Sequence, residues 1–225
     1  MSKIILILGA GKMVGLSIAN LFSTHGYKVA LASRSGTPLG EGKQFLSIKA
    51  DFTDPESMEG VFETVKRELG VPNVVVFNAY QSTFNPQPFS LPLSTFSSGV
   101  AISITSAFAA LKYSIEGFDT LPADVKKTFI YTGNKLNVEP WPQLLDLGVG
   151  KAAGAHMVVA AQKGYGGSGY RFYYADERKA DGDPVNLNIN GDNHAQFFWK
   201  LACASEQGPC LATFVGSEFV DFGGA

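Results

Sequence analysis

Short apolar runs alternate with longer segments of helical periodicity along the chain, which is the pattern of a sheet covered by helices. The apolar runs predict buried parallel strands at residues 3–8, 27–32, 45–49, 73–77, 128–132, 171–175 and 211–215. The longer segments predict helices after the first strand and at residues 55–69, where apolar residues recur at helical spacing, at 94–115 and 144–163, which are rich in small residues, and at 194–204. Because strands and helices alternate throughout, we predict one α/β domain over residues 1–225 with a doubly wound parallel sheet.

A glycine loop follows the first predicted strand and contains Gly9, Gly11 and Gly15. Gly9 permits a tight turn, Gly11 lets the backbone approach a pyrophosphate, and Gly15 lets the next helix pack closely on the strand. The N-terminus of that helix then faces the anion, as in the Rossmann fold. Lys12 lies in the loop, and Arg34 lies just past the second strand, where an adenosine ribose would bind. These two cations favour a 2′-phosphate, so NADP(H) is predicted over NAD(H).

Polar residues at the ends of later strands are candidates for the same crevice, because ligands bind at the carboxyl ends of such sheets. Asp51 could accept a hydrogen bond from an adenine amino group, or could close an Asx turn or cap a helix. Asn78 could hold the central loops or a cofactor ribose. Thr132 is expected to direct its hydroxyl into the crevice, while Tyr131 points to the opposite face of the sheet.

Lys151 is the cation whose surroundings are least expected, since it lies in a predicted helix among glycine and alanine residues. An unpaired buried charge is costly there, so Lys151 must either reach solvent or be held by a partner. Helical geometry puts Leu144, Leu147 and Ala155 on its face. None of these three side chains can donate a proton.

Composition narrows the possible partners to small molecules. Hydrophobic residues make up 45% of the 225 residues and charged residues 17%, and the formal net charge is −2 without a basic cluster. We therefore expect no nucleic-acid or membrane surface. The apolar start, Ile4–Leu8, is too short for a signal sequence or a membrane span, so a cytoplasmic protein is expected. Cys203 and Cys210 are expected to be buried small hydrophobes, and no metal-ligand spacing is found.

Several separate motifs resemble the short-chain dehydrogenase/reductase family over nearly the whole chain. The loop from Leu8 to Gly15 resembles the family's T-G-x-x-x-G-x-G, Asp51-Phe52 its adenine-binding acidic position, and Asn78-Ala79-Tyr80 its N-A-G. Lys151 corresponds to the family's cofactor-binding lysine. The resemblance implies a homodimer or homotetramer and an NADP(H) site formed by Gly9, Gly11, Lys12, Met13, Val14, Gly15, Ser33, Arg34, Asp51, Phe52, Asn78, Ala79, Tyr80 and Lys151.

The catalytic positions implied by the resemblance depart from the family pattern. The family's proton-donating tyrosine, four residues before its lysine, falls on Leu147. Its strand-end serine falls on Thr132 or Gly133, and its helical asparagine falls on Ser103. The implied catalytic residues are therefore Thr132, Ser103 and Lys151, without the usual acid. A different proton source remains open, and the candidates are an ordered water, Tyr80, Tyr174 and Asp176.

Three functions are compatible with these residues. The first is an NADP(H)-dependent oxidoreductase that acts on a small organic substrate by an atypical proton route. The second is a non-redox enzyme on the same scaffold, such as a cyclase, isomerase or dehydratase, which the replacement at Leu147 favours. The third is a cofactor-binding protein without turnover.

Overall fold

One eight-stranded sheet forms the centre of the molecule. The computed structural model describes residues 3–36, 40, 42 and 44–223. The strand order is β3-β2-β1-β4-β5-β6-β7-β8, in which all neighbours are parallel except the antiparallel pair β7 and β8. The order reverses beside β1, so the predicted doubly wound sheet is confirmed. The strands are β1 (Ile4–Leu8), β2 (Lys28–Ser33), β3 (Leu46–Lys49), β4 (Val74–Phe77), β5 (Lys127–Thr132), β6 (Tyr170–Glu177), β7 (Leu211–Val215) and β8 (Glu218–Phe219).

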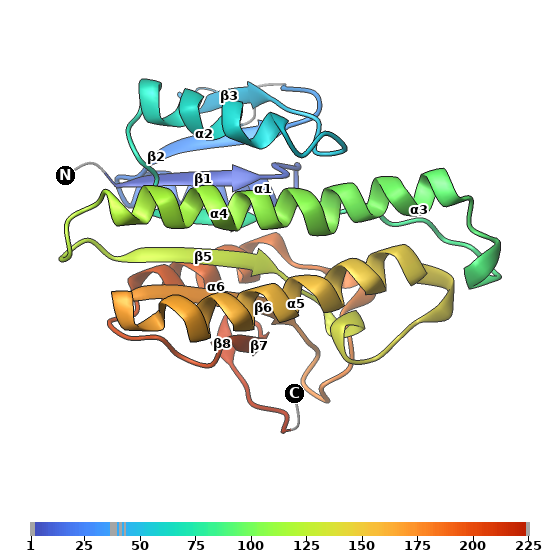
Figure 1. The fold of residues 1–225 in the computed structure, drawn as a ribbon. Helices are drawn as coiled ribbons and strands as arrows, with labels where there is room; N and C mark the ends of the chain where they lie inside the picture. The colour runs from blue at the N-terminus through green and yellow to red at the C-terminus, as the bar shows by residue number, and fades with distance from the viewer. Residues whose placement is uncertain (1–2, 37–39, 41, 43, 224–225) are drawn as a thin grey trace.

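Helices cover both faces of the sheet, and α4 and α5 run across the front of it in Figure 1. The other face is covered by α1 (Val14–Thr24) and α6 (Gly191–Cys203), which pack against each other. The front layer consists of α2 (Ser57–Glu68), α3 (Leu93–Val100), the π-helical segment η2 (Ala101–Thr105), α4 (Ser106–Asp119) and α5 (Leu145–Tyr165). Short 3₁₀ turns lie in the connections, at η1 (Pro88–Ser90), η3 (Lys135–Asn137), η4 (Pro142–Leu144), η5 (Gly166–Ser168) and η6 (Asn186–Asn188).

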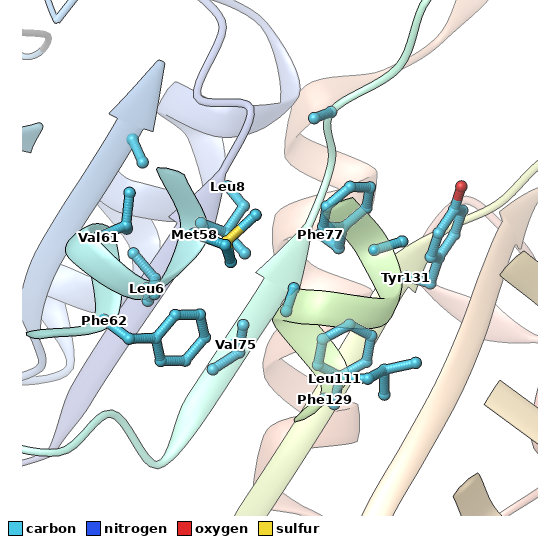
Figure 2. Packing of buried hydrophobic residues seen from close by; sticks show 14 of the residues in the cluster. Leu6, Leu8, Met58, Val61, Phe62, Val75, Phe77, Leu111, Phe129 and Tyr131 are labelled. Atoms are coloured by element: carbon cyan, nitrogen blue, oxygen red, sulfur yellow. The ribbon is translucent and has the colours of Figure 1, made fainter. Parts of the chain in front are cut away.

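The core between the sheet and the front helices is rich in aromatic rings. Figure 2 shows Phe77 and Tyr131 on neighbouring strands, with Phe129 and Leu111 beneath them. The rings of Phe77 and Tyr131 stack with their centroids 5.3 Å apart, and Tyr131 stacks on Tyr174 at 5.7 Å. This row of rings fixes the carboxyl ends of β4, β5 and β6, where the functional site is expected.

Four features differ from the sequence prediction. The helix predicted at residues 94–115 is interrupted by η2, because the chain inserts a π turn where α3 continues into α4. The loop predicted from Asp176 to Asn193 is shorter, since β6 continues to Glu177 and the side chain of Asn190 caps α6. Strand β8 was not predicted. The prediction that both cysteines are buried was wrong, because Cys203 ends α6 at the surface and is exposed, while Cys210 is partly buried.

Two helical segments, Leu93–Asp119 and Pro142–Ser168, are long and apolar enough to cross a membrane by length and composition alone. In the fold they lie on the front face of the sheet, as Figure 1 shows for α4 and α5. Within the fold, 33% and 39% of their most apolar windows are buried, so the larger part of each window is not.

Candidate functional site

The glycine loop is shaped by the close approach of the β1 and β4 ends. Gly9 has a φ of +88°, and a Cβ on it would lie 2.4 Å from the backbone nitrogen of Ala79. Glycine is therefore required here for both conformation and space. The Asn78 side-chain amide donates to the Gly9 carbonyl at 2.9 Å. Asn78 thus holds the central loops, which is one of its two expected roles.

The next two glycines of the loop have different surroundings. A Cβ on Gly11 would meet no described atom within 4 Å, so the space beside it is open, as a close-approaching pyrophosphate would require. A Cβ on Gly15 would lie 2.9 Å from the Cα of Ala10. Gly15 therefore permits the first turn of α1 to pack against Ala10, in the loop just after β1, while α1 also packs on β1 as predicted. Lys12 and Met13 are exposed just before α1, whereas Val14 is buried.

A pocket of about 360 Å³ lies at the carboxyl ends of β1, β2, β3 and β4. It brings together nine of the residues expected in the cofactor site, together with Ala10, Ser35 and Ile102. The other five expected residues, Lys12, Met13, Val14, Gly15 and Lys151, do not line it. The nine are Gly9, Gly11, Ser33, Arg34, Asp51, Phe52, Asn78, Ala79 and Tyr80.

Asp51 has a local role besides lining this pocket. Its Oδ1 accepts the backbone N–H of Thr53 at 3.0 Å, which is an Asx turn. This hydrogen bond lowers the pKa of the Asp51 carboxyl below its ordinary value. The turn predicted as the alternative is therefore present, and the carboxylate still faces the pocket beside Arg34.

Lys151 is buried in α5 and held by a partner. Its Nζ donates to the backbone carbonyl of Thr132 at 2.5 Å, and it lies 5.1 Å from the ring centre of Tyr131 and 5.8 Å from that of Tyr80. Burial lowers the pKa of Lys151 to about 8, although the carboxylate of Asp176 opposes the shift. The ammonium group therefore sits at the end of β5, next to the loop that follows β4.

Ser103 lies opposite Lys151 in the π-helical segment η2. The Tyr131 hydroxyl donates to the Ser103 carbonyl at 3.2 Å, and a Cβ on Gly150 would lie 2.5 Å from the Cβ of Ser103. The side-chain hydroxyls of Ser103 and Thr132 are buried and have no hydrogen-bond partner among the described residues. Ser103 and Thr132 thus both adjoin the Tyr131 to Lys151 cluster, and each has a buried hydroxyl without a partner among the described residues.

Comparison with known proteins agrees with this geometry. The family model described as short chain dehydrogenase matches residues 3–170. The chain belongs to this family. The short chain dehydrogenase/reductase dmxR12 of Cryptosporiopsis sp. is 39% identical over 235 residues, which covers 98% of this chain and 95% of that protein. The 3-oxoacyl-[acyl-carrier-protein] reductase MabA of Mycobacterium bovis is 33% identical over 79 residues, 35% of this chain and 30% of MabA.

Solved structures share the fold of this short chain dehydrogenase at low sequence identity. A metagenomic short-chain oxidoreductase in complex with NADP has a TM-score of 0.83 at 16% identity, covering 95% of this chain and 96% of that chain. ElxO with NADP bound has a TM-score of 0.80 at 16% identity, covering 96% and 98%. These likenesses concern the fold.

The proton-donor candidates of this chain differ in how accessible their side chains are. Leu147 is 7% exposed and cannot donate. The Tyr174 hydroxyl donates to the Asn134 carbonyl at 2.7 Å and accepts the Asn134 N–H at 3.0 Å, and burial raises its pKa well above the ordinary value. Asp176 is buried and paired with Arg178. Tyr80 is 58% exposed and adjoins Lys151, so it is the candidate whose side chain is accessible.

Two buried acidic residues near the site were missed by sequence reasoning. Asp146, in the first turn of α5, accepts the backbone N–H groups of Thr83 at 3.2 Å and Leu147 at 2.8 Å, and thereby ties the loop after β4 to α5. Glu177 ends β6 and accepts the N–H of Asn190 at 2.9 Å, with Nδ1 of His194 at 3.4 Å. An acidic residue in the first turn of an apolar helix was the available signal for Asp146; no local pattern marked Glu177.

The part of the chain that the structure describes contains no group of three or more metal-ligating side chains.

Proposed function

We propose that this protein is an NADP(H)-dependent oxidoreductase that acts on a small organic substrate. The observation that carries the proposal is the pocket that joins Gly9 and Gly11 to Arg34 at the end of β2. The NADP named in the descriptions of two structural neighbours supports the same cofactor. Family membership supports the oxidoreductase class.

The residues of the pocket fit the parts of a dinucleotide phosphate. The open space beside Gly11 and the N-terminus of α1 suit the pyrophosphate, and Arg34 suits a 2′-phosphate through paired hydrogen bonds. Lys12 adds positive charge at the loop. Lys151, beyond the pocket lining, would hold the nicotinamide ribose. When bound, NADPH supplies the hydride for reduction.

The proton must come from a residue other than Leu147, which cannot donate one. Tyr80 is the proton donor, because its phenol is accessible and its ring adjoins the buried ammonium of Lys151. The unpartnered hydroxyl of Thr132 stabilises charge that develops on the substrate. A substrate that needs no strong acid, such as an iminium ion or an activated alkene, suits this arrangement.

A non-redox reaction on the same scaffold is the second candidate, and the buried Leu147 favours it. An isomerase, cyclase or dehydratase would convert its substrate without a net change in NADPH absorbance. A binding protein without turnover would neither convert a substrate nor consume NADPH. The consumption of NADPH during substrate conversion therefore separates the three functions.

Thermal unfolding with each cofactor tests the proposed site. At about 100 times the dissociation constant, binding adds roughly 2.7 kcal/mol to stability, so we expect NADPH to raise the Tm by several degrees and NADH by less. The double variant Arg34→Ala with Lys12→Ala should remove the difference. The matched control is Lys66→Ala with Arg67→Ala on the exposed side of α2. It loses the same two positive charges and should keep the difference between the two cofactors. Equal shifts from both cofactors in the unmodified protein would contradict the assignment.

We also propose a homodimer or homotetramer formed through α4 and α5. The unburied part of their apolar windows supports this assembly, since monomers seldom expose large contiguous apolar patches. Phe108, on α4, is 60% exposed and belongs to this surface.

A further inference from the structure

A second and larger cavity, of about 600 Å³, lies away from the nucleotide pocket. It is formed by the segment after β5, the strands β6 and β7, and the segment from β8 to Gly223, the region below α5 in Figure 1. No described residue lines both this cavity and the nucleotide pocket. Its volume is within the range of about 300–1,000 Å³ that is usual for small-molecule sites.

Two buried polar atoms of residues at this cavity, Oδ1 of Asn137 and Oδ1 of Asp176, have no partner in the described part of the chain. Asp176 lines the cavity and is 2% exposed. Its Oδ2 accepts Nε and Nη2 of Arg178, both at 2.5 Å, and Nη1 of Arg178 donates to the Gly182 carbonyl at 3.1 Å. Oδ1 of Asp176 has no hydrogen-bond partner in the described part of the chain. A buried carboxylate oxygen without a donor is costly, so a ligand that donates a hydrogen bond would relieve that cost.

The charge of this acid is already balanced. Because Arg178 neutralises Asp176, the remaining acceptor favours a neutral donor over a second cation. Lys135, the other cation at the cavity, is bound to Glu139 at 2.8 Å and lies 3.7 Å from Asp183, so an anionic ligand gains little from it. Because both cations at the cavity are already paired with carboxylates, we expect the ligand to donate through a neutral group such as a hydroxyl.

The walls of the cavity are suited to a ring. Tyr174, Phe219 and Phe222 line it, together with Val138 and Leu211. The Tyr174 hydroxyl is occupied by Asn134, so only its ring is available to a ligand. Apolar and aromatic walls with a few polar groups between them are typical of sites for small aromatic molecules, and Oδ1 of Asp176 is one such group.

We propose that this cavity binds a neutral phenolic ligand, whose ring lies against the aromatic walls and whose hydroxyl donates to Oδ1 of Asp176. The site is separate from the proposed cofactor site. It goes beyond the proposed oxidoreductase activity and does not depend on it.

Ligand-observed NMR titration with 4-ethylphenol tests the proposal, with 4-ethylanisole as the probe that lacks the donor. We expect 4-ethylphenol to bind about tenfold more tightly than the ether, since one hydrogen bond to a charged group contributes that much. Saturating NADPH should not displace it. The absence of 4-ethylphenol binding, equal binding of the ether, or displacement by NADPH would each overturn the proposal.

Three variants, one of them a control, locate the binding of 4-ethylphenol. Phe219→Ser removes a wall side chain that is 44% exposed, so folding should be unaffected while 4-ethylphenol affinity falls several-fold. Phe89→Ser, which removes a 92% exposed ring on η1 outside the cavity, is the matched control and should leave affinity unchanged. Asp176→Asn, where it folds, should reduce the preference for the phenol over the ether. Unchanged affinity in Phe219→Ser would also overturn the proposal.

Discussion

Burial of Lys151 lowers the pKa of its ammonium group into a pH range in which protein unfolding can be measured. Burial lowers the pKa of its ammonium group to about 8, whereas an unfolded chain would give a value near 10.4. Between these two values the unfolded state binds more protons than the folded state. The stability contributed at this residue should therefore rise as the pH increases from about 8 to 10.4, and should be lost as the pH falls through 8.

The substitution Lys151→Met tests this residue directly. We expect the rise in unfolding free energy across this pH window to be smaller in the variant, by up to roughly 3 kcal/mol, the equivalent of the shift. Urea unfolding at several pH values measures it. Lys112→Met, at an exposed position on α4, is the control and should follow the unmodified protein. An identical pH dependence in Lys151→Met would show that the buried amine is not the titrating group.

The contact between α5 and η2 decides how Lys151 is placed, and two glycines of α5 test it. A Cβ on Gly150 would lie 2.5 Å from the Cβ of Ser103, whereas one on Gly148 would come no nearer than 3.9 Å to Leu136. Gly148→Ala should stabilise the protein by up to about 1 kcal/mol through helix propensity. Gly150→Ala should destabilise it by about 1–3 kcal/mol, because α5 must move away from η2. Chemical unfolding of the two variants compares them, and stabilisation of Gly150→Ala would contradict the close packing.

At the level of elements, strongly patterned segments were predictable and irregular ones were not. The prediction for β7, an apolar run, matches its bounds, and that for α5, a segment rich in alanine and glycine, differs by one and two residues at its ends. The π turn in η2 has no such pattern, since it depends on the packing of Ser103 against α5. Strand β8 is two residues long and exists through its pairing with β7. Tertiary contacts, and not local preference, define both.

At the scale of the whole molecule, the nucleotide pocket was far more predictable than the second cavity. All contributors to the pocket except Ile102 lie at or just after the end of a strand, and parallel strands bring their carboxyl ends to one edge. The cavity instead combines Lys135, Asp176 and Phe219, which no motif connects. The likewise unpredicted pairing of Asp176 with Arg178 arises from the extension of β6 beyond its predicted end.

The uncovered front face of the molecule leads to a prediction about assembly. If α4 and α5 form the subunit contact, a charge placed there must be buried without a partner, which is costly. Phe108→Glu, at a residue that is 60% exposed in one chain, should therefore shift the protein from an oligomer toward a monomer. Light scattering coupled to size-exclusion chromatography measures the mass. Phe89→Glu adds the same charge on η1 and should leave the mass unchanged. A monomeric mass for the unmodified protein, or an unaltered oligomer in Phe108→Glu, would rule out this face as the interface.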